Sequence, residues 1–137
     1  MAVEVTSTVI TALCEHATIA APHECCGILL GDSQRVTAIQ RTANVHSTPE
    51  THFEIDPQAL IDAHRAARAG GPQVAGYYHS HPSGPPEPSA TDRAMAAGDG
   101  RIWAIIGGNG KIRFWRDMPE GFQSVSYTCS EGPGRTP

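Results

Sequence analysis

The chain has 137 residues, 39% of them hydrophobic, and a formal net charge of −4, which fits one globular domain and argues against a disordered or fibrous protein. Its basic residues form no stripe that could hold nucleic acid through phosphate contacts. No apolar run approaches the about 18–20 residues of a membrane helix, and the first residues lack the basic and apolar regions of a secretory leader. We therefore expect a cytoplasmic protein with neither a nucleic-acid nor a membrane partner, folded over residues 1–129 and followed by a flexible tail at 130–137.

The first third of the chain predicts a helix and a hairpin. Apolar residues recur every three or four positions from Val9 to Ala20, so a helix is expected there, capped by Ser7 or Thr8 and stopped by Pro22. Residues 25–31 form a short apolar run that favours a buried strand. Residues 35–43 favour its neighbour, joined to it by a turn.

The middle of the chain predicts a second helix between two extended segments. Residues 52–56 alternate in polarity, and Pro57 suits the first position of a helix over 58–69 that Gly70 and Gly71 end. Residues 73–81 are rich in β-branched and aromatic side chains, which favours a strand.

Glycine and proline are concentrated just before and after that strand. Of the 14 glycines and 11 prolines in the chain, nine lie between positions 70 and 88, and the segment 82–88 breaks the chain after the strand. A short helix is expected from Ser89, and three further strands at 101–106, 111–116 and 121–129. The sequence thus predicts one α/β domain with a mixed, twisted sheet of about six strands, two main helices and a short third helix.

Four cysteines are present, and two of them are adjacent: Cys14, Cys25, Cys26 and Cys129. In a reducing cytosol they are expected to be small buried hydrophobic residues without disulfides. Since no Cys-x-x-Cys pair occurs, a structural zinc site made of thiolates is not expected.

Two histidines carry the first chemical signal. His79 and His81 are two apart on a predicted strand, so both imidazoles point to the same face. Imidazoles are common zinc ligands, and a catalytic zinc keeps three protein ligands and one open position. Asp92, near the start of the short helix, is the nearest candidate for the third ligand. The ordinary interpretation, two histidines that pack or face solvent without a metal, stays open for this pattern taken alone.

Two further residues also have ordinary interpretations. Ser89 followed three residues later by Asp92 is typical of a helix capping box, which does not prevent the serine from facing a neighbouring site. Glu24 directly precedes the apolar run 25–31, where a solvated carboxylate at the start of a strand is common.

Taken together, these residues resemble the motif of the JAMM (MPN-plus) metallopeptidases. The motif has a distant glutamate, then His-Ser/Thr-His-Pro, and, after a gap of seven residues that follows the second histidine, Ser-x-x-Asp; Glu24, residues 79–82, Ser89 and Asp92 match it in register. Residues 24–31 and 53–56 are similar to segments of the short prokaryotic members. The resemblance covers roughly residues 9–127 and implies an MPN/JAMM-like fold.

The resemblance also implies roles for these residues. His79, His81 and Asp92 would bind one Zn²⁺ per chain, Glu24 would be the general base and acid, and Ser89 would help to stabilise the oxyanion. These roles agree with general chemistry, because zinc lowers the pKa of bound water from ~15.7 to about 7, a carboxylate can carry the proton, and a hydroxyl can donate to the oxyanion.

JAMM enzymes of this kind hydrolyse peptide or isopeptide bonds after the C-terminal Gly-Gly of ubiquitin-like proteins. The resemblance therefore implies a ubiquitin-like or sulfur-carrier protein as substrate. Two alternatives stay open: a metal-free MPN scaffold that only assembles complexes, which usually lacks the metal ligands, and a zinc hydrolase of small amides.

Other residues are expected to be structural. Cys25 has no task in a metal mechanism, so packing is the better interpretation. His64, on the apolar face of its helix, is expected to be packed or to contact a metal ligand, rather than to bind a metal itself. Trp103 and Trp115 are expected to be core or sheet-surface aromatics rather than a substrate platform.

Overall fold

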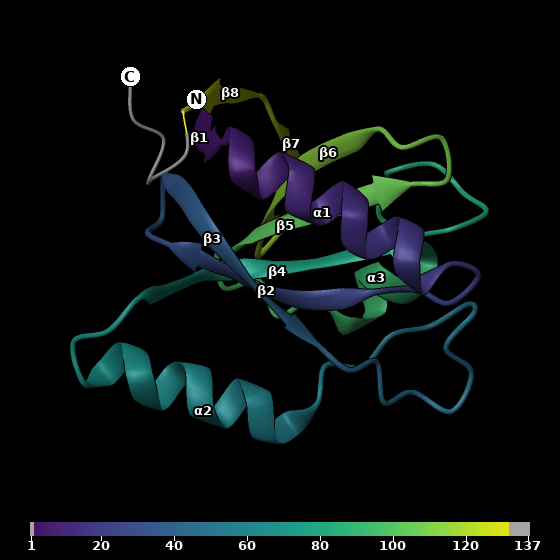
Figure 1. The fold of residues 1–137 in the computed structure, drawn as a ribbon, viewed down its shortest axis with the longest axis horizontal. Helices are drawn as coiled ribbons and strands as arrows, with labels where there is room; N and C mark the ends of the chain where they lie inside the picture. The colour runs from purple at the N-terminus through teal and green to yellow at the C-terminus, as the bar shows by residue number, and fades with distance from the viewer. Residues whose placement is uncertain (1, 132–137) are drawn as a thin grey trace.

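The computed structural model describes residues 2–131 and arranges them as a mixed sheet with helices on both faces (Figure 1). The elements in chain order are β1 (Val3–Thr6), α1 (Ser7–Ala20), β2 (Cys26–Gly31), β3 (Arg35–Thr42), α2 (Pro57–Arg68), β4 (Gln73–His81), α3 (Ala90–Met95), β5 (Ile102–Gly107), β6 (Ile112–Met118), β7 (Gly121–Val125) and β8 (Tyr127–Ser130). Among residues 2–131, none of the helices has the length and apolar character needed to span a bilayer.

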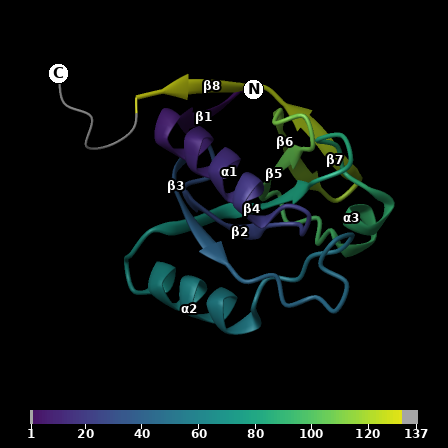
Figure 2. The same cartoon turned by 45° about the vertical axis from the view of Figure 1, so that its right-hand side comes forward.

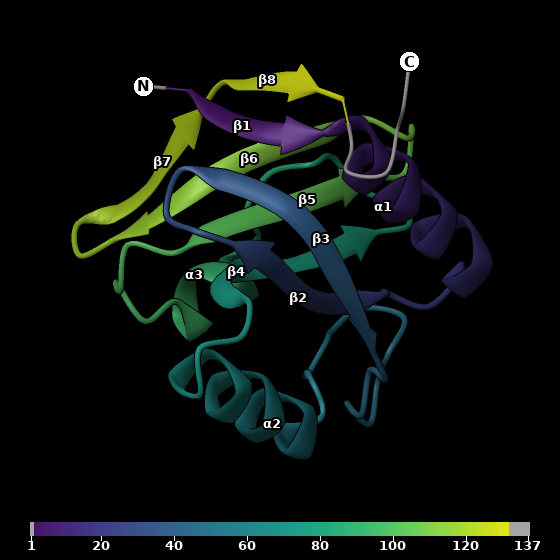
Figure 3. The same ribbon diagram turned by 60° about the vertical axis from the view of Figure 1, so that its left-hand side comes forward.

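The sheet is strongly curled. Its strand order is β7-β6-β5-β4-β2-β3-β1-β8, so β7 and β8 lie at opposite ends of the order although only Ser126 separates them in the chain. The Val3 N–H donates to the Ser126 carbonyl at 3.0 Å, which ties β1 to this connection. Figure 3 shows how the chain passes from β7 into β8, which lies beside β1.

The main core lies between the sheet and α1. Thr6 caps the helix through its hydroxyl, which accepts a hydrogen bond from the Val9 N–H at 3.4 Å. Val9 and Leu13 face inward and pack in a cluster with buried side chains from most of the strands. Burial of these side chains fixes α1 on one face of the sheet.

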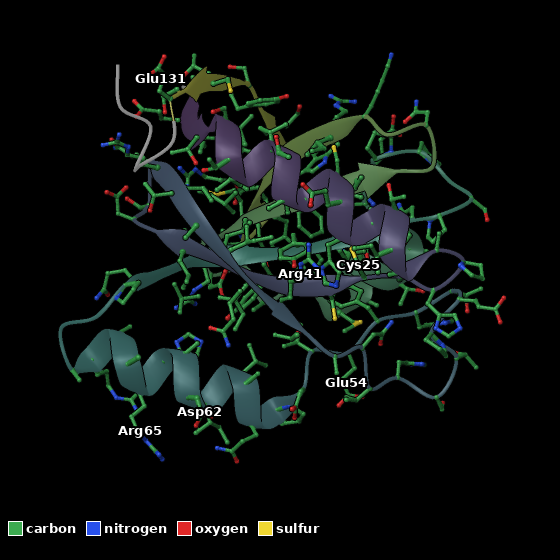
Figure 4. The ribbon with its side chains drawn as sticks, viewed as in Figure 1. Cys25, Arg41, Glu54, Asp62, Arg65 and Glu131 are labelled. Atoms are coloured by element: carbon green, nitrogen blue, oxygen red, sulfur yellow. The ribbon has the colours of Figure 1, made fainter. Side chains whose placement is uncertain are left out.

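The other face of the sheet carries α2 and a second, smaller core. Pro57 occupies the first turn of α2, and the Asp56 side chain caps the helix by accepting from the Gln58 N–H. Figures 1 and 2 show α1 and α2 on opposite sides of β4. In Figure 4, Asp62 and Arg65 lie on the side of α2 that is turned away from the sheet.

Strand β4 is central, because it pairs with antiparallel β2 on one side and parallel β5 on the other. A Cβ atom at Gly76 would lie 1.7 Å from the Ile102 carbonyl oxygen of β5, so a side chain at this position would push the two strands apart. Both histidines of interest lie at the C-terminal end of this strand.

The expected α/β class, the three helices and the strand 73–81 are confirmed, whereas the expected number of about six strands is too low. The four-residue β1 was not expected, and Ser126 divides the expected strand 121–129 into β7 and β8, which pair with different partners. Residues 52–56, expected to be extended, form no strand; within this segment only Ile55 makes an isolated bridge, to Asn44. Thr6, rather than Ser7 or Thr8, caps α1.

Two further expectations need comment. Cys25 and Cys26 are buried as expected, but Cys14 is half-buried and Cys129, on the terminal strand β8, is exposed. The expected tail 130–137 begins at the last residue of β8, and its residues 132–137 lie outside the described part of the chain.

Candidate metal centre

Three side chains from two elements converge at the end of β4. Because side chains alternate along a strand, His79 and His81 both project to the face of the sheet opposite α1, and their Nε2 atoms lie 3.0 Å apart. Asp92 approaches from α3: its Oδ1 and Oδ2 atoms each lie 3.1 Å from the Nε2 atom of His79, and its Oδ2 atom lies 3.3 Å from the Nε2 atom of His81. The structure thus brings together the three residues that the sequence indicated as ligands.

The proline-rich segment between β4 and α3 turns the chain back over the strand end. The Gly84 N–H donates to the His81 carbonyl at 3.2 Å, and the Gly108 N–H donates to the Gly84 carbonyl at 2.9 Å. From β6, the indole N–H of Trp115 donates to the Pro86 carbonyl at 3.2 Å. Proline restricts the backbone of this segment, and these hydrogen bonds hold it in place. Little conformational entropy is therefore lost when Asp92 is brought next to the histidines.

Both interpretations of the Ser89–Asp92 pair are compatible with the geometry. The Ser89 hydroxyl accepts a hydrogen bond from the Asp92 N–H at 3.0 Å, and the Asp92 carboxylate accepts one from the Ser89 N–H at 2.9 Å, which is a complete capping box. The same carboxylate contacts both histidines. Since the hydroxyl accepts in the cap, its own proton is available to another acceptor.

Burial and hydrogen bonds set the protonation of the two histidines. The His81 Nδ1 atom lies 2.8 Å from the Pro85 carbonyl oxygen; because a carbonyl only accepts, Nδ1 carries a proton, and Nε2 is the atom left to bind a metal. Burial opposes ionisation of this ring, yet Asp92 and the Pro85 carbonyl raise the pKa of His81, so a metal must displace a proton from Nε2. Burial lowers the pKa of His79, which favours the neutral, ligating imidazole. Burial opposes ionisation of Asp92, yet the hydrogen bonds from His79 and His81 hold the pKa of this carboxyl below its usual range.

The donor set fits a zinc ion. Zn²⁺ takes imidazole nitrogen at about 2.0–2.1 Å and carboxylate oxygen at similar distances, so two nitrogens of a tetrahedral site lie about 3.3 Å apart. The 3.0 Å between the two Nε2 atoms is close to this value. Three ligands also leave one position of a tetrahedral ion open, as catalytic zinc requires.

Aromatic rings form the wall behind His79. The Phe53 ring stacks on the imidazole with 4.2 Å between centroids, and the Trp103 ring meets it edge-on at 5.8 Å. His79 is completely buried, and its Nδ1 atom has no hydrogen-bond partner among residues 2–131. The wall therefore excludes water from one side of the site and fixes the plane of the ring.

Glu24 lies in a groove of about 370 Å³ that His81 and Ser89 also line. Its side chain is only 7% exposed. Burial raises the pKa of the Glu24 carboxyl to about 7, with His81 lowering it and Asp92 raising it to a smaller extent. A buried carboxyl with a pKa near neutrality can both take and return a proton.

The sequence did not indicate the residues that hold these groups in place. They are Asn44, which bonds to the Glu24 carbonyl, Ser80, whose hydroxyl accepts from the Cys25 N–H at 2.8 Å, and Trp115, which holds the proline-rich segment. All three act over separations of 20 residues or more, and no local pattern marks such contacts.

Cys25 is structural, as expected. It packs in the core beneath α1, at the start of β2 (Figure 4). Burial raises the pKa of its thiol to about 11, so it is protonated and unreactive at neutral pH.

The other aromatic and histidine expectations also hold. Trp103 is buried in the second core cluster, and Trp115 packs against that cluster. His64 is part of α2, and its Nε2 atom lies 3.2 Å from the hydroxyl of Tyr77 in β4.

Comparison with known proteins identifies similar sequences. Residues 6–117 match the family described as prokaryotic homologs of the JAB domain. The desampylase of Haloferax volcanii is 36% identical over 107 residues, which cover 77% of this chain and 77% of that protein. A probable TtuB-protein conjugate cleaving protease of Thermus thermophilus is 36% identical over 101 residues, or 74% of this chain and 66% of that protein.

The fold also matches a solved structure. A protein from Desulfitobacterium hafniense, determined in solution, is 26% identical and superposes with a TM-score of 0.83 over 94% of this chain and 93% of that one.

Proposed function

Because the chain belongs to the prokaryotic homologs of the JAB domain and is an isopeptidase of JAMM type, we propose that it uses zinc to release a ubiquitin-like or sulfur-carrier protein from its conjugates. The bond broken would be the amide that follows the C-terminal Gly-Gly of that modifier. The observation that carries the proposal is the convergence of two imidazoles and a carboxylate beside a groove that contains a buried glutamate.

His79, His81 and Asp92 would hold the zinc ion. When bound, zinc lowers the pKa of water from ~15.7 to about 7 and polarises a carbonyl group as a Lewis acid. The Pro85 carbonyl orients the His81 ring, and the Phe53 ring orients His79.

Glu24 would carry the proton during hydrolysis. With a pKa of about 7, its carboxylate accepts a proton from the attacking water and returns it to the nitrogen of the leaving amine. Its low exposure keeps bulk water from competing for that proton.

Ser89 would donate a hydrogen bond to the oxyanion that forms at the scissile carbonyl. Ser89 lines the groove, and its hydroxyl oxygen accepts a hydrogen bond from the Asp92 N–H. The capping box therefore fixes the oxygen and leaves the proton for the substrate.

The substrate class draws on the relatives. One is named for cleaving conjugates of a protein modifier. A Gly-Gly tail has no side chains, so its backbone could lie close to the floor of the groove and bring its last carbonyl near His79, His81 and Asp92.

The proposal is tested with zinc-loaded protein and three substrates. They are a ubiquitin-like protein joined through its C-terminal Gly-Gly to a peptide lysine, the same protein with a linear extension after Gly-Gly, and a Gly-Gly amide of a fluorescent amine. We expect cleavage of the first two, and no activity in a His79→Ala variant that has lost zinc. Cleavage of the fluorescent amide alone would support a small-amide hydrolase, and zinc binding without any cleavage would support a scaffold.

A further inference from the structure

The side chain of Asn44 lies next to Glu24 and uses its full hydrogen-bonding capacity. Its Nδ2 atom donates to the Glu24 carbonyl at 3.0 Å and to the His52 carbonyl at 2.9 Å. Its Oδ1 atom accepts from the His46 N–H at 3.1 Å and from the Glu54 N–H at 3.0 Å. One half-buried amide thus joins four backbone groups.

The bonds of Asn44 connect Glu24 to the segment between β3 and α2. The same segment holds Glu24 a second time, because the Glu24 N–H donates to the Pro49 carbonyl at 2.7 Å. The bridge between Asn44 and Ile55 closes this segment into a loop. The backbone of Glu24 is therefore held at both its N–H and its carbonyl by residues 44–49.

The connection is needed because Glu24 lies outside the sheet. Strand β2 begins at Cys26, and the last support from β4 is the Ser80 hydroxyl, which accepts from the Cys25 N–H at 2.8 Å. On the N-terminal side of Cys25, at Glu24, no pairing with a neighbouring strand holds the described chain. The position of the Glu24 carboxyl then depends on the loop, and the loop depends on Asn44.

Resting on the function proposed above, we infer that Asn44 is a positioning residue for the general base Glu24. It does not touch the substrate or the ligands His79, His81 and Asp92. It fixes the Glu24 backbone, so the carboxyl meets the attacking water at the correct distance, where an error of about 1 Å can cost about a hundredfold in rate.

The test compares Asn44→Asp with Asn44→Ala. Aspartate keeps the oxygen that accepts from His46 and Glu54, but it places an acceptor against the Glu24 and His52 carbonyls, which repels both. Alanine removes the four bonds without adding a charge, and it keeps the test decisive if the aspartate variant does not fold. Asn109→Asp is the matched control, because Asn109 is exposed and its hydrogen bond from the Lys111 N–H uses only the oxygen that aspartate retains.

We expect both Asn44 variants to lower kcat at least about tenfold while their zinc affinity, measured by competition with a chelator, stays that of the wild type. The Asn109→Asp control should keep the wild-type kcat. In a Glu24→Gln background, Asn44→Asp should change the remaining rate less than about twofold, because no base is left to misplace.

Three results would overturn the inference. The first is a folded Asn44 variant with the wild-type kcat. The second is a loss of rate that is as large in the Glu24→Gln background as in the wild type, and the third is a loss of rate that parallels a loss of zinc; each of these two would show a general structural role. Absence of cleavage by the wild type would count against the proposed function. The ratio of the kcat of an Asn44 variant to that of the wild type tests the positioning role of Asn44.

Discussion

Glu24→Gln should stabilise the metal-free protein, and more so at higher pH. Burial raises the pKa of this carboxyl from 4.5 to about 7, so between these values the folded protein holds a proton that the unfolded chain has released. Folding stability then decreases as the pH rises through this window. Glutamine is neutral at every pH and avoids this loss.

The size of the effect follows from the two pKa values. At about 1.36 kcal/mol for each pH unit, the interval from 4.5 to about 7 corresponds to at most about 3 kcal/mol. Most of it, about 2 to 3 kcal/mol, should develop between pH ~5 and ~8. Since the side chain is only 7% exposed, solvent screening reduces this value little.

The assay is urea unfolding of chelator-treated protein at several pH values. The free energy of unfolding of Glu24→Gln, minus that of the wild type, should increase with pH. Glu50→Gln is the control, because Glu50 lines the same groove but is exposed, and it should leave stability unchanged. A difference between Glu24→Gln and wild type that stays constant with pH would show that Glu24 has the same pKa in the folded and unfolded protein.

Three further changes have defined outcomes. Ser89→Ala should lower kcat about 10²–10³-fold through loss of the oxyanion donor and lower stability by about 1 kcal/mol through loss of the cap; steady-state kinetics and urea unfolding measure both, and an unchanged kcat would exclude the oxyanion role. Trp115→Phe removes the hydrogen bond to Pro86 and should weaken zinc binding about tenfold in chelator competition; wild-type affinity would show that the bond is dispensable. Phe53→Ala should cost about 3–5 kcal/mol in urea unfolding, and a cost under about 1 kcal/mol would contradict its place in the wall behind His79.

The sequence predicted best where local signals agree. Strand β4 begins and ends where expected, because β-forming residues are enclosed by glycine and proline on both sides. Helix α2 follows from Pro57 and the glycines after it. The convergence of His79, His81 and Asp92 could be predicted because a strand repeat puts the two histidines on one face and the helix start brings Asp92 back over the strand end.

The missed features depend on contacts between remote segments. Strand β1 has four residues and becomes a strand only by pairing with β3 and β8. Residues 53–56 alternate like a strand, but their neighbours place Phe53 against His79 instead. Asn44 and Trp115 are ordinary polar and aromatic residues in the sequence, and only the folded chain brings them to Glu24 and the proline-rich segment.

In the proposed function, Glu24 carries the proton for a zinc site that hydrolyses conjugates. The most direct test is the single-turnover release of a ubiquitin-like protein from a peptide lysine by wild type and Glu24→Gln, each shown to hold one zinc per chain. Loss of general acid–base catalysis should slow the variant about 10²–10⁴-fold at equal zinc content. Equal rates for the two proteins, or release by wild type that persists after zinc is removed, would contradict the account.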